Sequence, residues 1–257
     1  MREGDLIYLL DEKGKRHFIQ LVKGMVKVPG LGVIDCSRLL SSTDGERVIV
    51  AGREFVLLTP RAPELMESLD RGAQVIMPKD AATIAFRLGI ECGDVVVEAG
   101  VGSGSLTTAL LSAVGPTGMV ISIEMREDHA SKARKNVERT GKSDRWQLHI
   151  GDARQVELEA SANALVMDLP APWEALENLG RYLNPGGRVC AYVPNVNQME
   201  EAVKALRSHG YVEIEALENL QRTMEVHEGG VRPSFEMLGH TGYLIFGRKT
   251  VPRPAKG

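Results

Sequence analysis

The sequence predicts an α/β protein in which a doubly wound, largely parallel sheet follows a small amino-terminal β domain. Residues 5–58 consist of short β-rich runs separated by turn residues, which is typical of a small sheet or barrel of hairpins. From Gln74 onward strand-like and helix-like segments alternate, which favours a parallel sheet covered by helices. Two prolines within residues 59–63 interrupt the first pattern, so we expect two domains, 1–65 and 66–257.

The composition is that of an ordinary globular protein of 257 residues, of which 43% are hydrophobic. The formal net charge of −3 excludes indiscriminate binding to polyanions but leaves room for a local basic patch. No window approaches the roughly 18 consecutive apolar residues of a membrane span, and the chain start lacks a signal-peptide apolar region. We therefore expect a cytoplasmic protein with no membrane partner. The three cysteines, Cys36, Cys92 and Cys190, are too scattered for a disulfide framework or a zinc site, and we expect buried thiols, with one disulfide left open.

In the amino-terminal domain, apolar and β-branched runs predict four strands. They cover residues 6–10, 18–22, 47–50 and 54–58. Pro63 suits the first turn of a helix that we expect to run through about residue 71.

The second domain is expected to begin with a helix over residues 81–88, which Asp80 is placed to cap. A strand at 95–100 and a helix at 105–114 follow. The later strands are expected at 119–124, 146–150, 164–168, 188–194, 211–224 and 243–249, and the later helices at 128–140, 173–182 and 198–208. The sheet thus has seven strands and ends in a hairpin, and residues 250–257 resemble a frayed tail.

The most informative stretch is the end of the strand at 95–100 and the turn that follows it. Gly100, Gly102 and Gly104 can take positive φ angles and let a ligand approach the backbone. A dinucleotide fingerprint would need its third glycine at position 105, where the chain has Ser105, so the spacing argues against a nicotinamide cofactor. With acidic Glu98 before the turn, it resembles the S-adenosylmethionine (SAM) turn of class I methyltransferases, although glycine alternation alone also fits a structural loop.

Further polar residues follow the other strands at their carboxyl ends, where an open α/β sheet binds its ligands. Glu124 ends the second parallel strand and can accept both hydroxyls of a ribose, or it is simply an exposed acidic strand end. Asp152 follows the third strand and can accept an adenine amine, or it is a turn aspartate. His129 fits a capping or surface role as well as a ligand contact.

The fourth strand runs into Asp168-Leu-Pro-Ala-Pro-Trp173. Prolines stiffen such a loop, an acid accepts a hydrogen bond from an amino group, and an aromatic ring offers a stacking face. Methyltransferases that act on amino nitrogens of bases carry a similar segment, one residue shorter. The alternative is a proline-rich loop in which Trp173 packs on the core.

Five segments in order resemble the tRNA adenine-N1 methyltransferase family, whose enzymes modify the T-loop. They are residues 77–80, 98–107, 168–173, 192–198 and 232–243, and the resemblance covers about residues 1–249. It implies a doubly wound seven-stranded Rossmann-like methyltransferase sheet, SAM as cofactor with S-adenosylhomocysteine (SAH) as product, no metal, tRNA as partner, and a homotetramer. One departure is Met77, where the family often has tyrosine.

The resemblance also assigns residues. The implied cofactor-binding residues are Glu98, Gly100, Gly102, Ser103, Gly104, Ser105, Leu106, Glu124, His129, Asp152, Ala153 and Asp168. The residues that would border the base pocket or hold its walls are Met77, Tyr192, Asn195, Gln198, Arg232, His240 and Thr241. Asp168 is the catalytic candidate, because it would face both the sulfonium and the target base. Helix capping by Asn195 and Gln198 and a satisfied buried histidine at His240 remain alternatives.

Adenine N1 has a free lone pair and no proton to lose, so its methylation needs neither a strong base nor a metal. An ionised Asp168 that accepts from the neighbouring amino group would orient the base and stabilise the developing positive charge. Because N1 lies on the pairing edge, the adenine must be extruded. Basic side chains would offset that cost through contacts to RNA, unless they are plain solvated charges. The candidates are Lys13, Lys15, Arg16, Lys23 and Lys27, or Arg248, Lys249, Arg253 and Lys256.

The expected reaction is therefore methylation of N1 of adenine 58 in the T-loop, with adenine 57 open as a second site. A protein methyltransferase of the isoaspartyl carboxyl type shares the glycine turn, but it does not need the loop at 168–173. A non-catalytic tRNA-binding subunit is the other alternative, and the intact turn together with Glu124 and Asp168 argues for activity.

Overall fold

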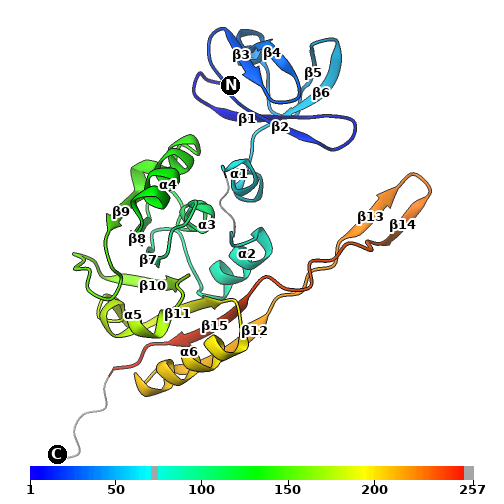
Figure 1. Ribbon diagram of the computed structural model, residues 1–257. Helices are drawn as coiled ribbons and strands as arrows, with labels where there is room; N and C mark the ends of the chain where they lie inside the picture. Colours follow the sequence, from blue (N-terminus) through cyan, green and yellow to red (C-terminus); the bar gives the residue numbers. More distant parts are fainter. Residues whose placement is uncertain (71–74, 252–257) are drawn as a thin grey trace, which may run out of the picture.

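The computed structural model describes residues 1–70 and 75–251 (Figure 1). The expected helix end near residue 71 and the basic tail residues Arg253 and Lys256 lie outside the described residues. Across the described ranges, no helix is long and apolar enough to cross a membrane.

The amino-terminal domain is built on an antiparallel sheet with the strand order β2-β1-β6-β5. Its strands are β1 (Leu6–Leu10), β2 (Arg16–Gln20), β5 (Arg47–Val50) and β6 (Arg53–Leu58), which confirms the four predicted strands with a small shift of the second. The separate hairpin β3 (Met25–Val28) and β4 (Gly32–Asp35) and the 3₁₀ helix η1 (Cys36–Ser41) were not predicted. Buried Ile7, Leu9, Phe55 and Leu57 form the core of this domain.

A seven-stranded sheet forms the second domain, with the strand order β12-β15-β11-β10-β7-β8-β9. Its strands are β7 (Val95–Ala99), β8 (Met119–Glu124), β9 (Trp146–Ile150), β10 (Ala162–Met167), β11 (Leu183–Val193), β12 (Val212–Glu218) and β15 (Tyr243–Arg248). Strands β7 to β11 pair in parallel, and β15 lies antiparallel between β11 and β12. The predicted doubly wound sheet with its final hairpin is confirmed.

Helices cover both faces of this sheet (Figure 1). They are α1 (Ala62–Ser68), α2 (Pro78–Arg87), α3 (Ser105–Ala113), α4 (Glu127–Arg139), α5 (Pro172–Leu179) and α6 (Val196–Ser208). Successive residues of a strand point to opposite faces, so Val96 packs with Leu110 of α3, whereas Val97 packs in the other cluster with Leu176 of α5. The two apolar cores hold the strands in register, and their carboxyl ends form the rim on which the site is built.

Two predictions about local structure are wrong. Asp80 does not cap a helix: α2 begins at Pro78, its N-cap is Met77, and Asp80 lies fully buried in the first turn. Proline at the first helical position supplies a preset φ and needs no amide partner, so it starts the helix earlier than a capping aspartate would. Cys92 is exposed, whereas Cys36 and Cys190 are buried as expected, and all three are free thiols.

The predicted strand at 211–224 is also wrong, because β12 ends at Glu218. The chain then leaves the sheet as an arm, residues 219–242, which carries the antiparallel hairpin β13 (Met224–His227) and β14 (Gly230–Pro233) before it returns at β15. Figure 1 shows this arm projecting from the body of the domain. Apolar residues recur beyond β12 at Leu220, Met224 and Val226, at even positions as in β12, so the strand pattern alone does not mark the point of departure.

Candidate active site

The carboxyl ends of four adjacent parallel strands bring the predicted site residues together. Since β10, β7, β8 and β9 are neighbours in the sheet, Asp168, the glycine turn, Glu124 and Asp152 follow one another along one rim. This is the edge at which open α/β sheets bind ligands.

Gly100 and Gly102 are glycines for different structural reasons. A Cβ atom on Gly100 would lie 2.0 Å from the backbone oxygen of Asp168, so glycine is required there by the close approach of two chain segments. A Cβ atom on Gly102 would meet nothing within 4 Å, although its φ of +55° favours glycine. Gly102 therefore faces open space at the rim.

Glu124 holds the turn in place. Its Oε2 atom accepts hydrogen bonds from the backbone amides of Val101 and Gly102, both at 3.1 Å, and its Oε1 atom accepts from the amide of Arg126 at 2.9 Å. The His129 Nδ1 atom lies 3.9 Å from Oε2, too far for a hydrogen bond. The Glu124 carboxylate is thus preorganised at the rim, and its Oε1 atom, which accepts one hydrogen bond, still has acceptor capacity for a hydroxyl.

The start of α3 has the features of an anion-binding site. No side chain caps the first turn of this helix, whose N-cap is Gly104. Within the described part of the chain, the buried Ser103 hydroxyl has no hydrogen-bond partner. Free amides at a helix start attract a carboxylate, and an unpaired buried hydroxyl adds a donor. Ser105 is engaged instead with the backbone oxygen of Ile76 at 3.2 Å, and Leu106 is buried.

Glu98 lies on the other side of the strand end, within the core. Its Oε2 atom accepts hydrogen bonds from the hydroxyls of Thr107 at 2.7 Å and Ser122 at 2.6 Å, and its side chain has no exposure. Burial, which outweighs these hydrogen bonds, raises the pKa of Glu98 to about 7. Glu98 thus joins β7, β8 and α3 beneath the turn, and we do not expect it to contact the cofactor directly.

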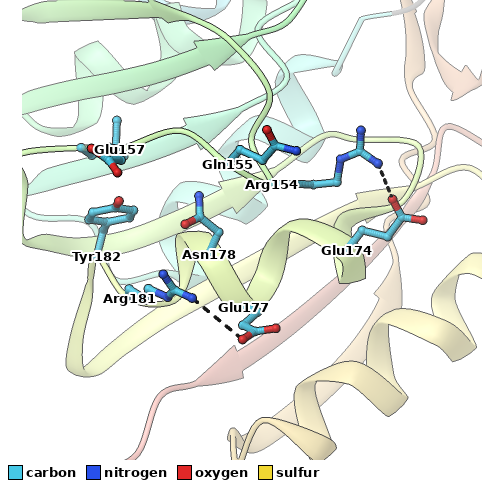
Figure 2. Close-up of a pocket in the computed structure, with 9 residues that line it drawn as sticks. Arg154, Gln155, Glu157, Glu174, Glu177, Asn178, Arg181 and Tyr182 are labelled. Carbon is cyan, nitrogen blue, oxygen red and sulfur yellow. Dashed lines mark hydrogen bonds and ion pairs between the residues drawn. The ribbon is translucent and has the colours of Figure 1, made fainter.

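Asp152 is paired with Arg154 at the neighbouring strand end. Arg154 Nη2 lies 2.7 Å from Asp152 Oδ2 and Nη1 lies 3.1 Å from Glu174 of α5. The side-chain hydrogen bond from Arg154 lowers the pKa of Asp152. Figure 2 shows Arg154 at the edge of a groove between α5 and the segment after β9, where Asn178 also lies. Asn178 donates to the backbone oxygen of Ala153 at 3.1 Å and so fixes the segment that carries Asp152.

Asp168 is the one rim carboxylate without a protein donor among the described residues. Solvent reaches its side chain. Dense protein around the carboxyl group, and next the negative charge of Glu124, raise the pKa of Asp168 to about 7. An acceptor that is accessible and unpaired is suited to a donor or a positive charge supplied from outside the protein.

The predicted base-pocket residues divide into two groups. Asn195 caps α6 by accepting from the amide of Gln198 at 2.9 Å, so the capping alternative is correct for Asn195. Gln198 donates to the backbone oxygen of Pro170 at 2.7 Å and thereby steadies the loop after Asp168. Met77 lies half-buried at the start of α2, immediately after Ile76, whose carbonyl accepts from the glycine-turn residue Ser105.

The remaining members lie at or in the arm. The Tyr192 hydroxyl donates to the backbone oxygen of Thr241 at 2.6 Å. His240 has Glu218 at 2.7 Å from Nδ1 and the backbone oxygen of Pro194 at 2.8 Å from Nε2, so it is satisfied, though exposed and not buried. Arg232 lies on β14, pairs with Glu225, and is therefore outside the site within one chain.

Two kinds of residue near the rim were not among the predicted candidates. Met125 and Ile150, at the ends of β8 and β9, are exposed by 64% and 45%, and their positions beside the acidic residues of the rim were the signal that could have identified them. Lys79 lies in one of the segments that carry the family resemblance, but the sequence assigned it no role, because two of its partners lie far away along the chain. Among residues 1–70 and 75–251, no group of three or more His, Cys, Asp or Glu is arranged to hold a metal ion.

Comparison with known proteins gives a consistent result. Residues 54–232 match the family model described as tRNA methyltransferase complex GCD14 subunit. The chain is 35% identical, over 93% of both chains, to the tRNA (adenine(57)-N(1)/adenine(58)-N(1))-methyltransferase TrmI of Methanocaldococcus jannaschii.

Two solved structures resemble the whole chain. One is a SAM-dependent O-methyltransferase from Thermotoga maritima, with a TM-score of 0.87 and 30% identity, covering 99% of this chain and 96% of that one. The other is the tRNA (m1A58) methyltransferase TrmI from Aquifex aeolicus, with a TM-score of 0.81 and 25% identity, covering 98% and 99%.

Proposed function

The chain belongs to the tRNA methyltransferase complex GCD14 subunit family, and we propose that it moves a methyl group from SAM to N1 of an adenine in the tRNA T-loop. The target is adenine 58, and adenine 57 is a second candidate because the relative from M. jannaschii is named for both positions. The observation that carries the proposal is Asp168, an unpaired carboxylate beside the glycine turn.

The residues of the rim suit SAM. The start of α3 and the Ser103 hydroxyl would receive its carboxylate, and Glu124 would accept from the ribose hydroxyls. Met125 and Ile150 would offer apolar faces to the adenine, while Asp152 would accept from its amine after sharing or releasing Arg154. SAM supplies an electrophilic methyl group on a positively charged sulfur. The chain itself supplies binding and orientation, and the proposal requires no metal.

Asp168 would act on the target base. Its carboxylate accepts a hydrogen bond from the adenine amino group, which orients N1, and its negative charge stabilises the positive charge that develops on the ring. No protein base is needed, since N1 carries a lone pair and no proton. The loop that begins at Asp168 is stiffened by Pro170 and Pro172 and is held by Gln198, so the acceptor stays in place.

We propose a homotetramer and tRNA as the partners. The arm exposes many large apolar side chains, as expected of an assembly surface. They are Leu220, Met224, Val226, Val231, Phe235, Met237 and Leu238, and Phe235 is 85% exposed. A tRNA substrate implies a cytoplasmic enzyme.

The amino-terminal basic residues are the better candidates for RNA contact. Lys13, Lys15, Arg16, Lys23 and Lys27 are all exposed. By contrast, the Lys249 ammonium donates to the backbone oxygen of Gly180 at 2.7 Å and is engaged within the body of the domain. Phosphate contacts of this kind orient the RNA but do not select its sequence.

Labelled SAM should be offered separately to bulk tRNA and to bulk protein. We expect label in tRNA, release of 1-methyladenosine on digestion, and reverse-transcription stops at adenine 58 or at 57 and 58. Label that appears in protein carboxyl groups would instead identify the isoaspartyl type. Release of only N6-methyladenosine, under conditions that prevent rearrangement, would point to an exocyclic-amine enzyme, and no label in either pool would point to a non-catalytic subunit.

A further inference from the structure

Lys79 occupies an unusual position for a lysine, almost buried at the start of α2. Its side chain is 11% exposed and lies 2.8 Å from an oxygen of Asp80, which has no exposure. Its ammonium also donates to the backbone oxygen of Asn219 and to the hydroxyl of Thr241, both at 2.7 Å. An ammonium has three N–H donors, and here three separate groups receive them.

Two of those groups belong to the residues at which the arm leaves and rejoins the sheet, here called the roots of the arm. Asn219 is the first residue after β12, and Thr241 lies two residues before β15 begins. Asn219 returns the contact, since its amide nitrogen donates to the backbone oxygen of Lys79 at 3.0 Å and to the Thr83 hydroxyl at 2.9 Å. One buried side chain thus holds the outgoing and the returning strand of the arm against the same turn of α2.

The returning root is also part of the wall beside Asp168. Tyr192 of β11 donates to the backbone oxygen of Thr241, and a Cβ atom on the next residue, Gly242, would lie 2.4 Å from the Tyr192 ring. Ala191 pairs with Met167 in the parallel ladder of β10 and β11, so the next residues of the two strands, Tyr192 and Asp168, lie beside each other. Lys79, Thr241 and Tyr192 therefore link the arm to the Asp168 side of the site.

We propose that Lys79 is a positioning residue that holds both arm roots in the arrangement required for placing the target base at Asp168. The proposal deepens the tRNA methyltransferase function and rests on it. It assigns Lys79 no contact with SAM and no step in the transfer. Displacement of the roots shifts the wall by a fraction of an ångström or more, which is enough to lower turnover while cofactor binding persists.

Removing Lys79 alone would leave the Asp80 charge buried and unpaired. The test therefore begins at Thr241, one of the acceptors of the Lys79 ammonium. Thr241→Val keeps the shape of the side chain but removes the oxygen that Lys79 binds, and Thr241→Ser restores that oxygen. The double variant Lys79→Met with Asp80→Asn removes the ammonium without leaving an unpaired charge. Arg87→Met is the matched control, because Arg87 also joins α2 to β12 through Glu215, at 2.6 Å, but on the surface.

Four quantities should be measured on the full-length protein: kcat and KM with tRNA, the Kd for SAM, and amide hydrogen exchange at the two roots. We expect Thr241→Val and the double variant to lower kcat about tenfold or more while the SAM Kd stays within about threefold, and root amides to exchange faster. Thr241→Ser should recover most of the kcat that Thr241→Val loses, and Arg87→Met should stay within about twofold of the wild type in every quantity.

Wild-type kcat in Thr241→Val and in the double variant would overturn the proposal, even with faster exchange at the roots. A loss of kcat shared equally by Thr241→Ser would overturn it as well, since the hydroxyl would then not be the cause. Failure of the proposed function is distinguishable: the wild type would not methylate tRNA, yet SAM affinity and root exchange would still report on the contacts of Lys79.

Discussion

The glycine turn and the loop that begins at Asp168 lie side by side at the rim, but they are held by different kinds of contact. The turn is fixed by backbone geometry and by Glu124, which lies only 23 residues from Val101. The base-side wall next to Asp168 depends on Lys79 and Thr241, which are 162 residues apart. The two halves of the site therefore differ in how far along the chain their supports lie.

This difference has a functional consequence. The half assigned to the cofactor is preformed by local contacts, so it should bind SAM without RNA. The half assigned to the base is linked to the arm, whose position depends on contacts outside the sheet, so it should be sensitive to assembly and to RNA. Variants that separate cofactor affinity from turnover test that division.

The largest separation should come from Asp168→Ala. Because this carboxylate has no protein donor among the described residues, its partner belongs to the substrate, and we expect turnover on tRNA to fall about a thousandfold. The SAM Kd, measured by calorimetry, should change less than about tenfold. Asp152→Ala is the complementary variant, with weaker SAM binding and a smaller change in turnover. If Asp168→Ala instead weakened SAM binding and Asp152→Ala caused the larger loss of turnover, the roles of the two residues would be exchanged.

Gly102→Val should give the next largest effect, on binding rather than chemistry. The new side chain projects into open space at the turn, so we expect SAM affinity to fall about a hundredfold. The positive φ adds a folding cost of about 1–3 kcal/mol, which a thermal melt can check. Gly100→Ala should do the reverse and fail to fold stably, because its Cβ would meet the Asp168 backbone. Unchanged SAM binding in Gly102→Val would remove the turn from the cofactor site.

The same contrast explains what the sequence could predict. The seven strands and the glycine turn depend on apolar periodicity and on residues with restricted φ, and both are local properties of the chain. Asp168 and Glu124 were identifiable since each ends a strand that the pattern located. Asp80 was assigned wrongly because an aspartate before an apolar run resembles a cap, whereas its burial together with Lys79 is a tertiary feature.

The remaining errors have a similar origin. Nothing in the residues around Lys79 indicates Asn219, which lies 140 residues away. The arm was joined to β12 because apolar residues recur past Glu218, whereas the strand ends where β15 no longer pairs with it. For His240 the sequence left two alternatives open, the base pocket and a satisfied buried histidine, and both of its ring nitrogens face acceptors of the protein.

The pH dependence of cofactor binding should sharpen the comparison. Since the pKa of Asp168 is about 7 in the free protein, lowering the pH from 8 to 6 protonates it, and SAM loses a negative partner for its sulfonium. We expect the ratio of SAM to SAH affinity to fall about threefold over that range, because SAH carries no sulfonium and its amino group titrates in both ligands. Asp168→Asn should abolish the change in this ratio. A constant ratio in the wild type would mean that Asp168 does not sense the sulfonium.

The smallest effect on activity should come from Glu98→Gln, although Glu98 directly precedes the turn. Burial raises the pKa of Glu98 from its ordinary 4.5 to about 7, so the protonated form favours the folded state. Stability from this group is complete below about pH 4.5 and is lost as the pH rises through about 7. The wild-type melting temperature should therefore fall more steeply between pH 5 and pH 8 than that of Glu98→Gln, which has no charge to bury.

Turnover and SAM affinity of Glu98→Gln should stay within about twofold of the wild type, and Glu215→Gln on the surface should reproduce the wild-type slope. A large loss of SAM affinity in Glu98→Gln would restore Glu98 to the cofactor site, and parallel melting curves would show that its carboxyl group is ionised at no cost.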